Sequence, residues 1–515
     1  MALNLFGGKV DHPLADPKQA QQRMAELPAD AAKALQELTE LLESLNQTDG
    51  FKADRRYETV DLLDGAAKNH QRKLAQDYLA MPRQQKFHEN RLWTGVFGFW
   101  HQLGDAYIRC VHDHETNVNG ATAVRKSMPV IVARALRTLT LQLKWVLLRY
   151  GLPEARIWGE LARLYQLAEQ KGYAGSAIAI YPGAHGASTA QREFLKALML
   201  SASSTDGLHP VRQEIAERAV AHFATSFKLS DKPDGCSHCF DLAAPKPPAR
   251  LFKGAAPNPT ARFFTAGDAL AALDQLTAQI AERGIPAEVN LGGNYEKEVV
   301  VSVLKHLSMQ WSDKPPVRSS ERRQTAGRIT VVPGLTDIMG VLDPASTDAL
   351  DFSSEQAAPS AESWIVVNVS EGGYGAIIPP QKSDWIKVGT LVGVQTEVSK
   401  HWGVGLIRRI LRDEHQQRQV GIQVLTRAAI PIKVSRSGTI SSFNANRESQ
   451  SAILLSTAPD KQGEVGVVLR DGLFNGRDSL DMTVKDKGYL LMPASMVEDG
   501  EDFDWAKFKV MQRGA

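Results

Sequence analysis

Three arginines lie close together in the segment VRSSERRQTAGR, which spans residues 317–328. They are Arg318, Arg322 and Arg323, and they precede a β-rich part of the chain. Guanidinium groups fork onto phosphate oxygens, donate to the O6 and N7 atoms of guanine, and stack on the planes of bases. On a mobile arm, such arginines can fold over a ligand that combines phosphates with bases. The alternative is a solvated linker whose charges serve solubility.

A second candidate segment, WIVVNVSEGGYG at residues 364–375, joins four apolar residues to small polar ones. The apolar run is typical of a strand, and Asn368 and Ser370 follow it directly. Their amide and hydroxyl groups can contact the polar edge of a base. Gly372 and Gly373 allow a close backbone approach and a positive φ. This pattern suits a rigid loop that receives a flat polar ligand, or a hairpin turn selected only for its backbone.

A cluster of cysteine and histidine invites a comparison with metal sites. Cys236, His238 and Cys239 have plausible ligand spacing, but a structural zinc site needs four ligands and the only other cysteine is Cys110. A redox Cys-x-x-Cys would need a surrounding β-α-β pattern, which is missing here. We therefore predict neither a metal site nor a redox site.

Composition limits where an anionic ligand could bind. The 515-residue chain has 60 basic and 58 acidic residues, for a formal net charge of +2. No global field favours nucleic acid or an anionic membrane, so any anion site must be local. Three cysteines without a spaced framework, and no recognisable signal peptide or membrane span, lead us to expect a cytoplasmic protein. The motifs of P-loop, zinc-protease and serine-hydrolase enzymes are missing, so we predict no catalytic residues and no cofactor.

The spacing of apolar residues changes along the chain and predicts an α+β multidomain protein. Residues 1–240 are predicted to be all-helical, because apolar residues recur at steps of three and four between short Gly, Pro, Asn and Asp breaks. Residues 241–262 hold five prolines and are predicted as a linker or a chain wrapped on a surface, with connecting helices in residues 263–311. Short β-rich runs predict an antiparallel β-barrel in residues 312–435, and further strands or a small β-domain in residues 436–515.

Together, the arginine segment and the strand-end segment resemble the ligand signature of PilZ domains, small β-barrels that bind cyclic di-GMP. In that family an Arg-x-x-x-Arg motif precedes the barrel, as Arg318 and Arg322 do here. An Asp/Asn-x-Ser-x-x-Gly motif lies at a strand end, as Asn368, Ser370 and Gly373 do here. The resemblance covers about residues 317–435, with strand-like runs between and after the motifs.

The sequence departs from the family pattern in several places. The motifs are separated by an extra polar stretch, DPASTDALDFSSEQAAPSAES, and Asn368 stands where Asp is commoner. Arg323 and Arg328 offer a competing register for the first motif, but that register has one residue too many. Because Arg328 also opens a predicted strand, we prefer Arg318 with Arg322. Arg408 and Arg409, later in the β-rich region, are interpreted as an exposed strand end.

The resemblance implies a bacterial cyclic di-GMP receptor that senses rather than catalyses. We expect the ligand to draw the segment 312–323 onto the barrel and to shift the helical domain, which would bind a partner protein still to be identified. The family suggests control of motility, the flagellum, type IV pili, adhesion or biofilm formation, without membrane insertion or binding to nucleic acid. The resemblance assigns ligand contacts to Arg318, Arg322, Arg323, Asn368, Ser370, Gly372 and Gly373.

Two alternatives come from other classes of protein. The first is a helical scaffold whose β-domain makes protein–protein contacts without a nucleotide ligand. The second is a binder of single-stranded nucleic acid on an OB-like barrel, which needs aromatic platforms and a basic groove. The β-rich region offers few candidate aromatic residues for such platforms, namely Tyr374, Trp385 and Trp402, and no basic excess. We therefore rank the nucleic-acid binder last.

Overall fold

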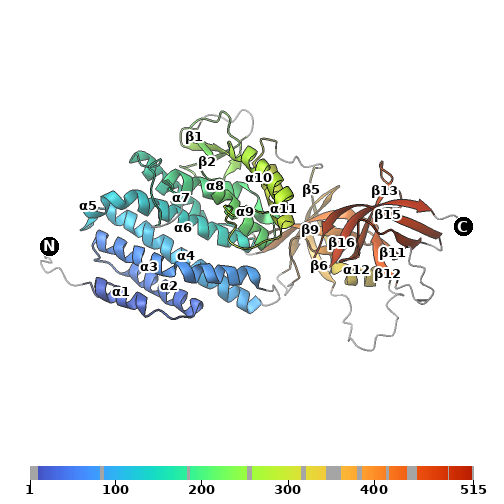
Figure 1. Cartoon of the computed structure of the whole chain (residues 1–515), viewed down its shortest axis with the longest axis horizontal. Coiled ribbons are helices and arrows are strands. Elements are labelled where there is room, and N and C mark those ends of the chain that lie inside the picture. Colours follow the sequence, from blue (N-terminus) through green and yellow to red (C-terminus); the bar gives the residue numbers. More distant parts are fainter. Residues whose placement is uncertain are drawn as a thin grey trace. The chain divides into compact units, whose positions relative to one another are not determined.

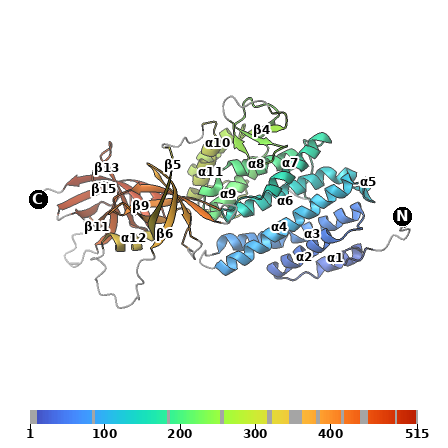
Figure 2. The same cartoon turned by 180° about the vertical axis from the view of Figure 1, so that it is seen from behind.

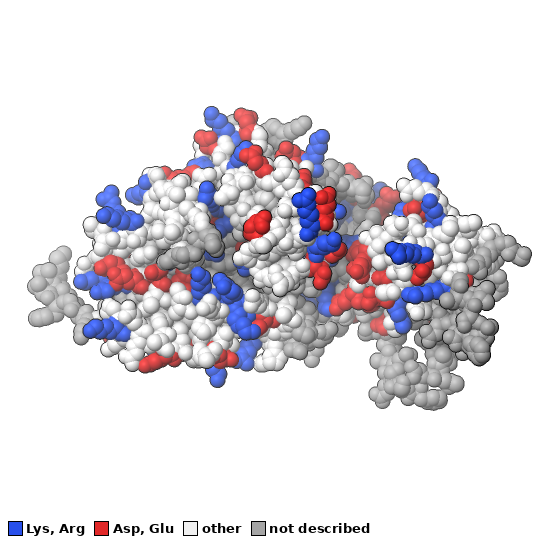
Figure 3. Space-filling view, in the orientation of Figure 1, with Lys and Arg blue, Asp and Glu red and all other residues white. Residues whose placement is uncertain are grey.

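The chain divides into two compact units, Met1–Val317 and Arg318–Ala515. Figure 1 and Figure 2 present the helices of the first unit and the strands of the second from opposite sides. On the face seen in Figure 3, basic and acidic side chains are interspersed, in keeping with the small net charge. The computed structural model describes residues 10–81, 86–181, 186–251, 258–314, 321–343, 361–379, 385–412, 417–437, 449–484 and 487–512.

The first unit is built from helices that pack around α6 (Met128–Leu148). This helix begins with a proline in its first turn and is buried on most of its surface, because it contacts α4, α7, α8 and α9. Among the described residues, no helix is long and apolar enough to cross a membrane. The other helices are α1 (Pro17–Ala25), α2 (Ala31–Gln47), α3 (Ala53–Ala80), α4 (Lys86–Glu115), α5 (Ala121–Val124), α7 (Ala155–Gln170), α8 (Ala190–Ala202), α9 (Pro210–His222), α10 (Ala269–Arg283) and α11 (Lys297–Trp311), with short 3₁₀ turns at Arg125–Ser127 and Thr205–Gly207.

A four-stranded sheet completes the first unit. Its strands are β1 (Lys228–Ser230), β2 (His238–Asp241), β3 (Ala249–Arg250) and β4 (Ala261–Thr265), in the order β1-β4-β2-β3. Phe240 and Phe264 are buried in the same core as the helices. Part of the predicted linker 241–262 therefore lies in this sheet, namely Asp241, Ala249, Arg250, Ala261 and Arg262, and large aromatic side chains on both central strands anchor the sheet to the core.

The second unit begins with a closed antiparallel barrel, which confirms the predicted α+β fold class. Side chains alternate between interior and surface along the strands, as with buried Trp364 and Val366 around exposed Ile365. The strands are β5 (Arg323–Pro333), β6 (Glu362–Ser370), β7 (Gly373–Ile378), β8 (Leu391–Thr396), β9 (Gly403–Arg412) and β10 (Arg418–Thr426), closed in the order β10-β7-β6-β5-β8-β9.

A second closed barrel follows directly. Its first strand is β11 (Ile430–Arg436), because this strand pairs with β12 and β14. The boundary predicted after residue 435 therefore falls too late, and residues 430–435 belong to the second barrel. The remaining strands are β12 (Gln450–Leu454), β13 (Glu464–Arg470), β14 (Leu480–Val484), β15 (Lys487–Asp499) and β16 (Phe503–Gln512), closed in the order β11-β12-β13-β16-β15-β14.

The two barrels share one apolar seam, so they form a single body. Helix α12 (Gly334–Leu342) follows β5 and lies in this seam, and the Leu335 amide donates to Asp502 Oδ2 of the second barrel at 2.9 Å. Strand β8 is buried on both faces over its first four residues, because one face lines its own barrel and the other meets the seam. The buried residues of the seam are Val332, Leu335, Ile338, Met339, Leu391, Val404 and Leu406 from the first barrel and Ile453, Leu455, Val468 and Phe503 from the second.

Candidate ligand-binding site

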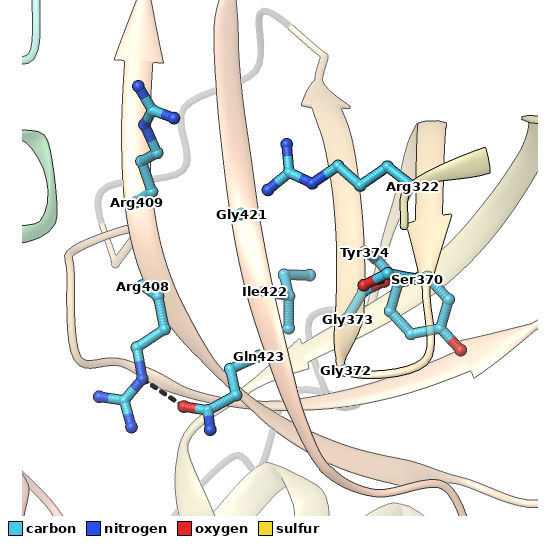
Figure 4. A pocket seen from close by; sticks show the side chains of 10 residues that line it. All are labelled: Arg322, Ser370, Gly372, Gly373, Tyr374, Arg408, Arg409, Gly421, Ile422 and Gln423. Atoms are coloured by element: carbon cyan, nitrogen blue, oxygen red, sulfur yellow. Dashed lines mark hydrogen bonds between the residues drawn. The ribbon is translucent and has the colours of Figure 1, made fainter. Parts of the chain in front are cut away.

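A pocket of about 380 Å³ opens on the first barrel where the arginine segment meets the β6–β7 hairpin (Figure 4). This volume lies within the range of small-molecule sites, roughly 300–1,000 Å³. Side chains reach it from both sides: Arg322, directly before β5, from one side, and Arg408 and Arg409, on β9, from the other. Among the residues that the structure describes, the pocket is lined by Arg322, Ser370, Gly372, Gly373, Tyr374, Arg408, Arg409, Gly421, Ile422 and Gln423, a set with three arginines and no acidic residue.

The β6–β7 hairpin forms one wall of this pocket. Ser370 pairs with Gly373, so Glu371 and Gly372 form a two-residue turn, and the Ser370 hydroxyl donates to the Gly373 carbonyl at 3.5 Å. A Cβ on Gly373 would lie 2.0 Å from the Ile422 carbonyl oxygen, so only glycine fits there. The close approach at Gly373 is therefore to strand β10 of the same barrel. The predicted positive φ is wrong for both glycines, since neither adopts the left-handed region.

Arg427 fixes the hairpin from the outside. Its guanidinium donates to the Tyr374 hydroxyl at 2.9 Å and to the Ser370 and Glu371 carbonyl oxygens at 3.1 and 3.0 Å. It also lies 5.6 Å from the centroid of the Tyr374 ring. Nothing in the sequence marks this residue, because an arginine just after a strand carries no local sign of a partner more than 50 residues away.

Asn368 lies beside the pocket but is not among its lining residues. It is opposite Gly375 in the β6–β7 ladder, and a Cβ on Gly375 would be 2.5 Å from Asn368 Oδ1. Because Gly375 has no side chain, the side-chain amide of Asn368 has room to lie over β7. Because side chains two residues apart share one face of a strand, Asn368 and Ser370 lie on the same face of β6.

The arginine segment enters the site at the beginning of β5. Arg322 lines the pocket, whereas Arg323 is exposed, pairs with Val369 and is not among the lining residues. Arg328 lies farther along the strand, opposite Ile365, and donates to the Ser363 hydroxyl at 3.3 Å. Arg318, the remaining arginine of the preferred motif, lies outside the described residues.

A β-bulge brings Arg408 and Arg409 to the same side of β9. Gly421 pairs with Arg409 and Ile422 pairs with Ile407, so Arg408 is the extra residue. Ile407 and Ile410 are both buried, and the two arginines between them face outward. The exposed strand end predicted for these arginines is therefore a wall of the pocket. The three-residue interval between the two isoleucines, in place of the usual two, is the sequence signal that could have found them.

The Cys-x-x-Cys segment lies in the first unit, in and beside strand β2. The His238 ring is buried and stacks on Phe264 at a centroid distance of 5.3 Å, and its Nδ1 is 2.9 Å from the Ser237 hydroxyl. Burial, with a smaller effect of Arg250, lowers the pKa of His238 to about 4. Burial also raises the thiol pKa values of Cys236 and Cys239. A neutral imidazole in the sheet core, beside protonated thiols, has the character of a packing residue.

Both units match models of one protein family. Residues 18–234 match the model described as "Cyclic-di-GMP receptor FimW, N-terminal domain". Residues 343–431 match the model described as "Cyclic-di-GMP receptor FimW, middle PilZ domain". Together, these matches cover more than half of the chain, and the second confirms the PilZ resemblance of the first barrel. A search of curated proteins found no match.

Proposed function

We propose that this chain, which belongs to the FimW family of cyclic-di-GMP receptors, binds cyclic di-GMP in the pocket beside the β6–β7 hairpin. The observation that carries the proposal is the convergence of Arg322, Ser370 and Gly373 on one pocket of a PilZ barrel. These residues come from two motifs that are well separated in sequence. The antiparallel pairing of β5 with β6 brings the two motifs together, and the pocket lies where they meet.

The chemistry of the pocket suits this ligand. Cyclic di-GMP carries two phosphate charges and two guanines, and the lining arginines supply charge, forked donors and planar faces for both. The Ser370 hydroxyl and the Asn368 amide supply the polar contacts to a guanine edge, and the missing side chain of Gly373 lets β7 approach β10 closely. Arg318 and Arg323 add further contacts to the ligand when the ligand draws their segment onto the barrel.

The receptor signals without catalysis in this proposal. Ligand binding orders the arginine segment, and the change passes through residues 312–317 into the helical unit, where a protein partner reads it. Control of motility, pili or biofilm formation is the role we infer from the PilZ resemblance, in the cytoplasm where the messenger is made. The alternative, a scaffold that binds only protein through its β-domain, predicts no response to the nucleotide.

A pair of arginine variants tests the site. Arg322→Ala removes a charge-assisted contact, so calorimetric titration of the full chain should give a cyclic di-GMP affinity roughly 10- to 150-fold weaker. Arg328→Ala is the matched control, because Arg328 lies outside the pocket on β5, the strand that follows Arg322, and should leave the affinity within about twofold. Equal effects of the two variants would mean that the arginines act only through general charge, and the assigned pocket would be wrong.

A further inference from the structure

A carboxylate of the second barrel forms an ion pair with one of the arginines that line the pocket. Glu498, on β15, accepts from Arg408 Nη1 at 2.7 Å and from Nη2 at 2.6 Å. Arg408 Nε donates to Gln423 Oε1 at 2.7 Å (Figure 4). The guanidinium thus presents one edge to Glu498 and another to Gln423. A ligand phosphate can fork onto Arg408 only by replacing one of these partners.

Glu498 is held near the pocket by the structure around it. It lies just before the β15–β16 turn, and three further residues of that region contact the first barrel or its helix α12. Glu501 pairs with Lys387 at 3.1 Å, Asp502 accepts from the Leu335 amide, and Phe503 is buried in the seam. Because the seam fixes this turn, Glu498 remains within reach of Arg408 whichever partner the arginine takes.

The relative strength of the two interactions decides which partner Arg408 takes when the ligand is present. The side chains of Arg408 and Glu498 are 36% and 25% exposed, and ion pairs with this much solvent contribute little to stability. A forked contact to phosphate is of the same charge-assisted kind as the fork to Glu498, so the exchange of one for the other costs little. A dianionic ligand in the pocket would also repel Glu498. Exchange of the carboxylate for phosphate is therefore favourable.

We propose that Arg408 is a ligand-binding residue that Glu498 withholds from the empty pocket, so that the C-terminal barrel forms part of the cyclic di-GMP site and competes with the ligand for this arginine. The inference rests on the proposed function and adds a second route for the signal. When the arginine leaves Glu498, the carboxylate at the β15 edge loses its partner and becomes available to another cationic group.

The chain supplies a matched control on the same turn. Lys387 and Glu501 form another ion pair between the two barrels, but neither residue lines the pocket. Glu501→Gln removes the same charge from the same turn as Glu498→Gln does. A difference between these variants therefore reports on Arg408 and not on the general field of the second barrel.

The experiment is a calorimetric titration of cyclic di-GMP into full-chain wild type, Glu498→Gln, Glu501→Gln, Arg408→Ala and the Arg408→Ala/Glu498→Gln double variant. Glu498→Gln should tighten binding by about 1.5- to 5-fold, the contribution of an exposed ion pair, and Glu501→Gln should not. Arg408→Ala should weaken binding about 10-fold or more, and in its background Glu498→Gln should tighten binding by less than it does in the wild type.

The outcomes separate this inference from the proposed function. Suppose that the wild type binds cyclic di-GMP. The competition is then overturned if Glu498→Gln weakens binding or leaves it unchanged, or if it tightens binding equally in the wild type and in Arg408→Ala. In each of these cases the proposed binding site still stands. If the wild type binds no cyclic di-GMP, the proposed function fails and the competition fails with it. Unchanged melting temperatures of the variants would exclude unfolding as a cause of weaker binding.

Discussion

At the scale of single residues, the site depends on one glycine that cannot be replaced and one arginine that binds no ligand. Gly373 lets β7 approach β10 closely. Arg427 holds the β6–β7 turn by hydrogen bonds to backbone carbonyl oxygens and to the Tyr374 hydroxyl. Neither role involves ligand chemistry. Both decide whether Ser370 and Arg322 line a pocket of fixed shape.

The first prediction concerns the two glycines of the hairpin. Gly373→Ala should destabilise the first barrel by about 1–3 kcal/mol, because the added Cβ meets the Ile422 carbonyl and the strands must part. Gly372→Ala is the control, since its Cβ would contact nothing within 4 Å and its φ is not positive. It should change stability by less than about 0.5 kcal/mol. Denaturant unfolding measures both, and a Gly373→Ala variant as stable as the wild type would contradict the tight approach.

The second prediction assigns Arg427 a positioning role. Arg427→Ala should weaken cyclic di-GMP binding by about fivefold, because it removes hydrogen bonds worth about 1 kcal/mol. It should also speed amide hydrogen exchange in residues 370–374. Arg427→Lys should not restore the affinity, because an ammonium group cannot reproduce the fork to two carbonyl oxygens and a phenol. An unchanged affinity with faster exchange would mean that the turn can bind ligand without being held.

At the scale of elements, the sequence allowed prediction of the strands and of the hairpin, because both leave a local signal. The apolar run 364–367 predicted strand β6, but its end was placed too early: the strand continues through Asn368 to Ser370, so these two residues lie in the ladder and not in a loop. The bulge in β9 was missed, since it depends on how Ile407, Ile410 and Ile422 pack together across strands. Strand β11 was grouped with its sequence neighbours for a similar reason: its pairing partners β12 and β14 come later in the chain.

At the scale of the whole molecule, the two units are joined by the segment around Pro315 and Pro316, directly before the arginine motif. Proline restricts the backbone of such a segment, so movement of the arginines should pass back toward α11. The ligand can bias that movement only if it binds one arrangement of the arginine segment more tightly than the other. The coupling free energy in such cases is roughly 1–3 kcal/mol.

Hydrogen exchange across the chain tests this coupling. With cyclic di-GMP bound, residues 312–325 and 366–376 should become protected, and exchange should also change in residues 260–310. Arg322→Ala at the same ligand concentration is the control and should lose all of these changes. Protection confined to the barrel, with nothing altered before Trp311, would make the helical unit a passive neighbour even though the ligand is correctly assigned.

The most direct test of the central claim is a calorimetric titration of cyclic di-GMP into the purified, unmodified chain. We predict saturable binding at micromolar ligand or below, and, because the pocket contacts are charge-assisted, an affinity that falls as the salt concentration rises. A titration without binding heat at these concentrations, with no protection of residues 366–376 by the nucleotide, would contradict the claim that this barrel is a cyclic di-GMP receptor.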